Sequence, residues 1–317
     1  MSPTLAGEHP IAVHPDQVST TTARAIALTG VTKDFGEVQA VRGLDLTVRK
    51  GEVVAFLGPN GAGKTTTIDM VLGLSQPTTG SVEVFGLTPE EAIARGLVSA
   101  VMQSGGLLKD LTVRDTVRFI AATFPGARPV EEVMATAGIT ELAGRQVGKC
   151  SGGEQQRLRF ALALVSDPEL IILDEPTVGM DVATRRAFWE AIRLDARAGR
   201  TIIFATHYLE EADLYADRIV LVREGSVVAD GTSSQIKASV TGRTLRATWP
   251  DADEAMLTAY PGVTGVEIHG DGITIHTTDS DTLARYLLAT TGAHDLEIVA
   301  RGLEDAFVAL TATSKES

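Results

Sequence analysis

The stretch "GPNGAGKTT", Gly58 to Thr66, decides how this chain folds, because it fills the pattern G-x-x-x-x-G-K-[ST]. The apolar run "VVAFL" precedes it, and a sequence typical of a helix, "TTTIDMVLGL", follows its lysine. By chance, a chain of this size would contain these four fixed positions in roughly one case in a hundred. The added requirement of a strand before them and a helix after them makes a chance match rarer still. A plain glycine-rich turn is therefore a weak alternative.

The residue types of this stretch predict a site for the phosphates of a nucleotide. Glycines let backbone N–H groups approach the phosphates, and the start of the following helix adds its dipole. Lys64 is expected to reach the β- and γ-phosphate oxygens, and Thr65 to ligate Mg²⁺. The candidate nucleotide-binding residues are those of the whole loop: Gly58, Pro59, Asn60, Gly61, Ala62, Gly63, Lys64, Thr65 and Thr66.

Two acidic residues end a second apolar run, "LIILDEP". Asp174 is suited to hold the Mg²⁺ shell, and Glu175 to polarise an attacking water as general base. Two acids after a strand, taken alone, are more typical of a helix cap. Beside a phosphate loop, the catalytic interpretation is favoured.

His207 follows a third apolar run, "TIIFAT". Ligands of doubly wound sheets bind at the carboxyl ends of the strands, so this side chain is a candidate contact of the γ-phosphate. An ordinary histidine at a helix start is the alternative. A zinc site is rejected, because "HYLEE" lacks the second histidine of the H-x-x-E-H motif.

The chain divides by pattern into a tail and two domains. Residues 1–24 are expected to be a flexible tail, and residues 25–235 alternate strands and helices, which predicts an α/β core with a largely parallel sheet. A helical segment is expected at about 104–165, from "TVRDTVRFIAATF" and "VEEVMATAGI". Residues 236–317 follow the order β-α-β-β-α-β, which predicts a small ferredoxin-like domain, with an irregular α+β tail as the alternative.

Composition limits the class of protein. The chain has 317 residues, 44% of them hydrophobic, and a formal net charge of -13, so nucleic acid is not expected as a partner. Its single cysteine, Cys150, excludes an internal disulfide framework and suits a reducing cytosol. No window approaches the roughly 18 to 20 apolar residues that span a bilayer, so any membrane role is expected to come through a partner.

These motifs, in this order, closely resemble those of the ATP-binding subunits of ABC transporters over about residues 25–235. The resemblance implies ATP hydrolysis with Mg²⁺, on a P-loop core with antiparallel β and helical subdomains. It implies that Phe35 stacks on adenine, that Gln103 senses Mg²⁺ and the helical segment, and that His207 is the switch histidine. It further identifies the signature residues Ser151, Gly152, Gly153 and Glu154, and the D-loop residue Asp181.

Each of these residues has an ordinary alternative when taken alone. Phe35 alone is more often a core residue, Gln103 a solvated amide, and Asp181 the N-cap of the helix that follows it. The chain also departs from the family pattern, with Cys150 for the usual leucine, Glu154 for glutamine and Met180 for leucine. Glu154 adds negative charge near a phosphate, which is expected to oppose closure, although activity is still expected.

The signature implies a second subunit. In the family it faces the γ-phosphate bound by the other chain, so two chains form two complete sites in a head-to-tail dimer that ATP closes and hydrolysis releases. A homodimer is expected.

The C-terminal text, including "GLEDAFVALTA", resembles ATPases of bacterial two-component exporters of the daunorubicin-resistance type. That implies a separate integral membrane permease, a position at the cytoplasmic face of the membrane, and export of a hydrophobic or amphiphilic compound. The alternatives are an importer ATPase with a regulatory C-terminal domain and a soluble ABC protein without a transport role.

Overall fold

The structure is a computed structural model that describes residues 23–102, 106–239, 242–300 and 302–311. Gln103 and the expected N-terminal tail up to residue 22 lie outside the described residues, so the role of Gln103 stays a prediction. The chain divides into two compact units between Ser233 and Ser234.

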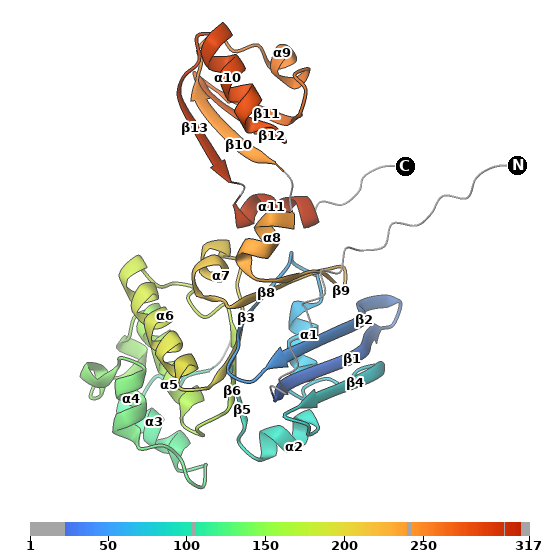
Figure 1. Ribbon diagram of the computed structural model, residues 1–317. Helices are drawn as coiled ribbons and strands as arrows, with labels where there is room; N and C mark the ends of the chain where they lie inside the picture. Colours follow the sequence, from blue (N-terminus) through green and yellow to red (C-terminus); the bar gives the residue numbers. More distant parts are fainter. Residues whose placement is uncertain (1–22, 103–105, 240–241, 301, 312–317) are drawn as a thin grey trace, which may run out of the picture. The chain divides into compact units, whose positions relative to one another are not determined.

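A six-stranded sheet forms the centre of the first unit (Figure 1). Its strands, in spatial order, are β5 (Val98–Val101), β6 (Leu170–Asp174), β7 (Thr201–Ala205), β3 (Val53–Leu57), β8 (Arg218–Arg223) and β9 (Ser226–Gly231). All neighbours are parallel except the hairpin of β8 and β9. Every residue of β3 and β7 is buried, as in parallel sheets covered on both faces. The carboxyl ends of β6, β7 and β3 therefore lie side by side.

A separate antiparallel sheet packs against this centre. It contains β2 (Val38–Arg49), β1 (Arg24–Phe35) and β4 (Thr79–Val84), in that order. Apolar residues of both sheets share one core, in which Ile26 and Val48 lie against residues such as Phe56. The antiparallel β subdomain implied by the sequence is therefore present, and it holds β2 beside the phosphate loop.

The helices of the first unit lie on both sides of β3, with α1 on one side and α3 to α6 on the other (Figure 1). Their bounds are α1 (Lys64–Val71), α2 (Pro89–Ala94), α3 (Val113–Ala121), α4 (Val130–Thr136), α5 (Gly152–Leu164), α6 (Val182–Arg197) and α7 (Leu209–Tyr215), with short 3₁₀ helices at Thr140–Leu142 and Val147–Lys149. Helix α8 (Ser233–Ser239) begins at the last residue of the first unit and continues into the second. In the described part of the chain, no helix has the length and apolar character needed to cross a membrane.

The second unit confirms the ferredoxin-like prediction. Its elements are β10 (Arg243–Thr248), α9 (Glu254–Thr258), β11 (Val263–His269), β12 (Gly272–Thr277), α10 (Ser280–Thr290), β13 (His294–Ala300) and α11 (Leu303–Thr311). The four strands form an antiparallel sheet in the order β11-β12-β10-β13, which is the split βαβ arrangement. Leu245, Ile275 and Leu283 are fully buried in a core that belongs to this unit alone.

Candidate active site

The phosphate loop joins β3 to α1, and its glycines are required by close backbone contacts. A Cβ on Gly58 would lie 2.2 Å from the carbonyl oxygen of Val222 in β8. A Cβ on Gly63, at a φ of 96°, would lie 2.5 Å from the carbonyl oxygen of Ala40 in β2. Gly63 is also the N-cap of α1, and no side chain among the described residues caps this helix start. Its N–H groups are therefore left to bind an anion.

Lys64 places its ammonium group inside the curve of this loop. Nζ donates to the carbonyl oxygens of Gly58 at 2.5 Å and Pro59 at 3.0 Å. Burial lowers the pKa of Lys64, and the charges of Glu175 and Asp174 oppose that shift. The lysine and the two acids therefore act on one another across the neighbouring strand ends.

The two acids lie at the carboxyl end of β6, where both are half-buried. Burial raises the pKa of Asp174, opposed by the charge of Lys64. Burial also raises the pKa of Glu175, opposed by His207. Glu175 has a φ of 50°, a left-handed conformation that few residues other than glycine adopt. This sharp turn ends the strand at the point where the side chain meets His207, which follows β7.

Glu175 and His207 form a hydrogen-bonded pair. Nδ1 of His207 lies 2.7 Å from Oε2 of Glu175, and the imidazole side chain is 60% exposed against 18% for the carboxylate. The pair exists because β6 and β7 are parallel neighbours, with Asp174 in register with Ala205. A base joined to an exposed imidazole at a strand end can accept a proton from water and stabilise charge on a phosphate.

The donors at this edge fit a magnesium nucleotide better than a metal bound by protein alone. No group of three or more His, Cys, Asp or Glu side chains able to hold a metal ion occurs in the described residues. Mg²⁺ is commonly bound through one or two carboxylates together with phosphate oxygens and water. Asp174 at the strand end and the exposed hydroxyl-bearing Thr65 are oxygen donors of that kind.

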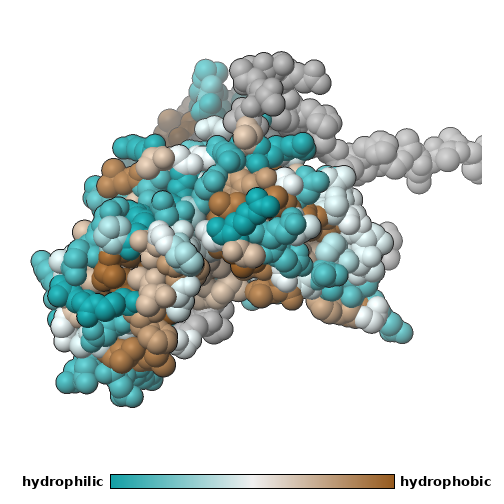
Figure 2. Space-filling model, turned by 90° about the horizontal axis from the view of Figure 1, so that it is seen from below, coloured by the Kyte–Doolittle hydropathy of each residue, from teal (hydrophilic) through white to brown (hydrophobic). Residues whose placement is uncertain are grey.

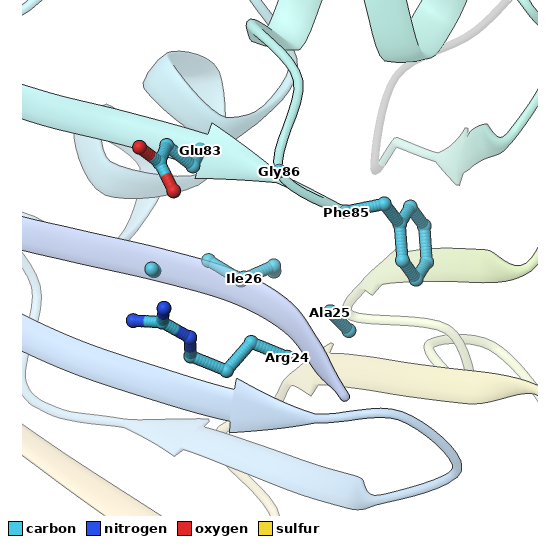
Figure 3. A pocket seen from close by; sticks show the side chains of 7 residues that line it. Arg24, Ala25, Ile26, Glu83, Phe85 and Gly86 are labelled. Carbon is cyan, nitrogen blue, oxygen red and sulfur yellow. The ribbon is translucent and has the colours of Figure 1, made fainter. Parts of the chain in front are cut away.

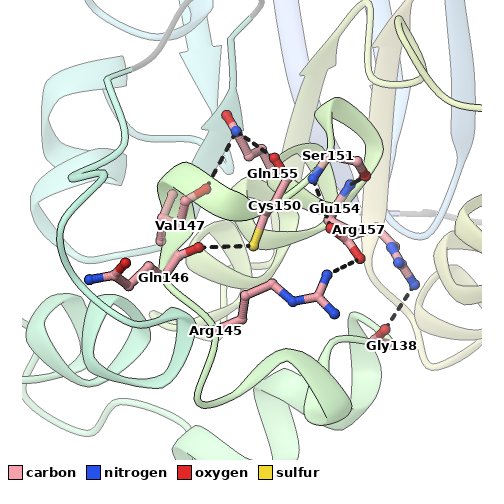
Figure 4. Close-up of polar contacts among 9 residues, drawn as sticks. All are labelled: Gly138, Arg145, Gln146, Val147, Cys150, Ser151, Glu154, Gln155 and Arg157. Atoms are coloured by element: carbon pink, nitrogen blue, oxygen red, sulfur yellow. Dashed lines mark hydrogen bonds and ion pairs between the residues drawn. The ribbon is translucent and has the colours of Figure 1, made fainter.

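The signature residues form the start of α5, where a capping box satisfies the helix end (Figure 4). Ser151 Oγ accepts from the N–H of Glu154 at 3.2 Å, and Glu154 Oε2 accepts from the N–H of Ser151 at 2.7 Å. Arg145 donates to the other oxygen of Glu154 at 2.8 Å. The hydrogen bond from the Ser151 N–H is the largest cause that lowers the pKa of Glu154. The charge that Glu154 adds to the signature is thus paired within the same chain.

Cys150 lies directly before the signature and is 8% exposed. Its Sγ lies 3.6 Å from the carbonyl oxygen of Gln146, and burial raises the pKa of its thiol. Both observations agree with a small buried hydrophobe. The signature also packs on the expected D-loop, because a Cβ on Gly153 would lie 3.4 Å from the side chain of Met180.

The remaining predicted residues are Asp181, before α6, and Phe35, on β1. Asp181 caps α6, since its carboxylate accepts from the N–H of Thr184 at 2.9 Å. Phe35, at the end of β1, is 55% exposed with the ammonium of Lys33 5.1 Å from its ring centre. An exposed aromatic ring is available for stacking, so the core alternative for Phe35 is wrong.

A cavity of about 220 Å³ lies at the edge of the antiparallel sheet, bordered by Arg24 on β1 and Glu83 on β4 (Figure 3). Its other lining residues are Ala25, Ile26, Ala27, Phe85 and Gly86. None of these belongs to the phosphate loop or to the strand ends that carry the acids and the histidine.

Sequence reasoning missed a buried carboxylate beside the catalytic pair. Glu211 of α7 is hydrogen-bonded to Thr177 and Thr206, residues that follow β6 and β7. No local pattern distinguishes Glu211 from Glu210, its exposed neighbour. Only the pairing of β6 with β7 brings its two partners together, so the sequence contains no short-range signal for this contact.

Comparisons with known proteins give consistent results. A family model described as ABC transporter matches residues 41–178. The Nod factor export ATP-binding protein I of Rhizobium sp. (strain N33) is 34% identical over 300 residues, which are 92% of this chain and 98% of that protein. Its counterpart in Burkholderia lata is 37% identical over 293 residues, or 89% of this chain and 95% of the relative.

Solved structures of ATP-binding cassettes align with about two thirds of this chain. A nucleotide-free ATP-binding cassette from an ABC transporter aligns with a TM-score of 0.61 at 24% identity, covering 68% of this chain and 94% of that one. A dimeric ATP-binding cassette in a post-hydrolysis state, bound to ADP and phosphate, aligns with a TM-score of 0.59 at 27% identity, covering 65% and 98%.

Proposed function

Because this chain belongs to the ABC transporter family, as an ATP-binding subunit that hydrolyses ATP, we propose that it powers export through a separate membrane permease. The observation that carries the direction of transport is the match to proteins named as Nod factor export ATP-binding proteins, which spans 92% of this chain. That match includes the second unit as well as the ATPase core. The exported compound is proposed to be hydrophobic or amphiphilic: a drug, a lipid or a natural product.

The catalytic roles in this proposal rest on the strand ends. Glu175 activates the attacking water as general base, and His207 holds the carboxylate and contacts the γ-phosphate. Lys64 and the loop amides bind the phosphates, while Thr65 and Asp174 bind Mg²⁺. These assignments predict that Glu175→Gln keeps ATP binding and loses hydrolysis by about 10²- to 10⁴-fold.

The proposed working unit is a head-to-tail homodimer. Its support is the position of the signature at the start of α5, while α1 lies on the other side of β3 (Figure 1). A second chain would bring its own signature to the phosphate loop, as two-fold symmetry allows. The solved dimeric cassette shows that this fold can assemble in pairs.

The permease is proposed to dock on the helical segment at the cytoplasmic face of the membrane. Among the described residues of this segment, the exposed large apolar side chains are Leu108, Phe119 and Phe124. Figure 2 shows apolar surface at the lower left of its view, on the side where Figure 1 places α3 and α4. Exposed apolar surface of this kind is typical of a protein-binding face.

The test is affinity purification of tagged Glu175→Gln protein from native membranes in mild detergent, with ATP and Mg²⁺, followed by mass spectrometry. We expect one dominant multi-spanning protein. The matched control is the same protein carrying Lys64→Ala, which should lose the ATP-dependent part of the recovery. Recovery of soluble partners alone, despite ATP-dependent dimerisation, would contradict the transport role and leave the ATPase intact.

A further inference from the structure

Glu211 is a buried carboxylate that joins the two loops of the catalytic pair. Its residue is 2% exposed. One carboxylate oxygen accepts from the hydroxyl of Thr177 at 2.5 Å, and the other accepts from the hydroxyl of Thr206 at 3.0 Å. Both threonines are themselves buried. A buried acid with a buried donor on each oxygen has a fixed geometry, because either hydroxyl would lose its partner if the carboxylate moved.

Each threonine lies close in sequence to one member of the catalytic pair. Thr177 follows Glu175 by two residues, and Thr206 directly precedes His207. The loop after β6 and the loop after β7 are therefore held to one carboxylate at a fixed separation. The contact between Glu175 and His207 spans the same two loops, so the two connections depend on one another.

The same carboxylate also contacts Arg185 of α6, which in turn contacts the residue after the histidine. Arg185 of α6 lies 3.6 Å from Glu211 Oε1, and its guanidinium lies 4.6 Å from the ring centre of Tyr208. The N–H of Tyr208 donates to the hydroxyl of Thr206 at 3.0 Å. Because Asp181 is the N-cap of α6, the network also includes the helix that follows the D-loop.

We propose that Glu211 is a positioning residue for ATP hydrolysis, which fixes the loops of Glu175 and His207 so that the base and the imidazole meet. The proposal rests on the catalytic roles given above for that pair. Among the described residues, no hydrogen bond or ion pair joins Glu211 to the phosphate loop. Its effect should therefore fall on the hydrolysis step rather than on ATP binding.

The first test replaces the carboxylate by an amide of the same shape, Glu211→Gln. One oxygen becomes an NH₂ group that faces a threonine hydroxyl, and the ion pair with Arg185 is lost. We expect kcat for ATP hydrolysis to fall by about 10- to 100-fold, as small misplacements of catalytic groups do, while the ATP Kd stays within about twofold.

The matched control is Asp195→Asn. Asp195 is another buried acid, paired with Arg200, but it lies at the end of α6, away from the strand ends of the site. The substitution has the same chemistry and should lower the melting temperature comparably without changing kcat. Equal kcat values for the two variants, or parallel losses of kcat and ATP affinity in Glu211→Gln, would overturn the positioning role.

A second pair of variants keeps the test informative where Glu211→Gln folds poorly. Thr177→Val removes one hydroxyl of the network at nearly constant volume, and Thr177→Ser keeps that hydroxyl. We expect kcat to fall in the valine variant and to be restored in the serine variant. Equal activity in both would contradict the proposal.

A double variant that combines Glu211→Gln with His207→Ala distinguishes a positioning role of Glu211 from a general loss of stability. If Glu211 acts by placing His207, then Glu211→Gln should cost less than about threefold in kcat when it is added to His207→Ala. An unchanged full loss in that background would refute the mechanism. Near-normal turnover of Glu175→Gln would instead refute the catalytic pair itself, so the two failures are distinguishable.

Discussion

At the scale of single residues, the properties of Glu175 come from its position at the end of a buried strand. Partial removal from water makes its carboxylate a stronger base than an exposed glutamate, and the imidazole of His207 limits this change by its charge and its hydrogen bond. A stronger base accepts a proton from water more readily, provided that it is ionised at the working pH. Burial and the contact with His207 therefore act together on the basicity of Glu175 and on the pH range in which it is ionised.

The pH dependence follows from this balance. Because burial raises the pKa of Glu175, kcat should fall on acidification at a higher pH than an ordinary glutamate would give. His207→Gln removes the group that lowers this pKa, so the acid limb of the residual activity should move to still higher pH. A pH–rate profile of both proteins checks this, with Glu210→Gln as the exposed control. Movement of the limb to lower pH would contradict the assigned base.

Candidate site residues can be predicted from the sequence where the chemistry depends on a local pattern. The phosphate loop has a required spacing and close backbone contacts, such as that of Gly58 with Val222, that only glycine permits. Glu211 and Arg145 could not be found in this way, since their partners are set by strand pairing and loop geometry. A charged side chain in a sequence gives no indication of which distant hydroxyl or carboxylate it meets.

At the scale of elements, β3, β6 and β7 were predictable because strands buried on both faces are continuous apolar runs. Strand β1 pairs with both β2 and β4, a pairing that no local pattern in the sequence specifies. Sheet membership depends on partners that are distant in sequence. The helices α3 and α4 lie within the two stretches expected to be helical.

The start of α5 gives a prediction for an element. Glu154→Ala removes half of the capping box and the ion pair with Arg145, so it should lower the free energy of unfolding by about 0.5 to 1 kcal/mol. The folded-state pKa of Glu154 is lowered, so its contribution is complete above the unfolded-state pKa and is lost as the pH falls through the folded-state value.

The difference in melting temperature between wild type and Glu154→Ala should therefore shrink on acidification. Circular dichroism melts across acidic and neutral pH measure it. Glu131→Ala, which removes an exposed ion pair with Arg114, should show a much smaller difference at neutral pH. A Glu154→Ala difference that grows as the pH falls would contradict the capping role.

At the scale of the whole molecule, the two units have separate cores. Leu283→Ala removes a fully buried side chain of the second unit and should destabilise that unit by about 2 to 5 kcal/mol. Among the described residues, the buried clusters of the two units have no residue in common, so ATP hydrolysis at moderate temperature should be unchanged. Calorimetry should show the unfolding transition of the second unit at a lower temperature and that of the first unit unchanged. A shift of both transitions would contradict the separation of the two cores.

The solitary cysteine has a practical consequence for following this molecule in motion. Cys150 is the only thiol in the chain, and its burial and raised pKa make it slow to react with maleimides or methanethiosulfonates. A reporter cysteine placed at exposed Val178, three residues after Glu175 and at the start of the expected D-loop, would therefore take a fluorophore or spin label selectively in the otherwise unaltered chain. Distances between two such labels would then time the approach and separation of subunits through each round of ATP turnover.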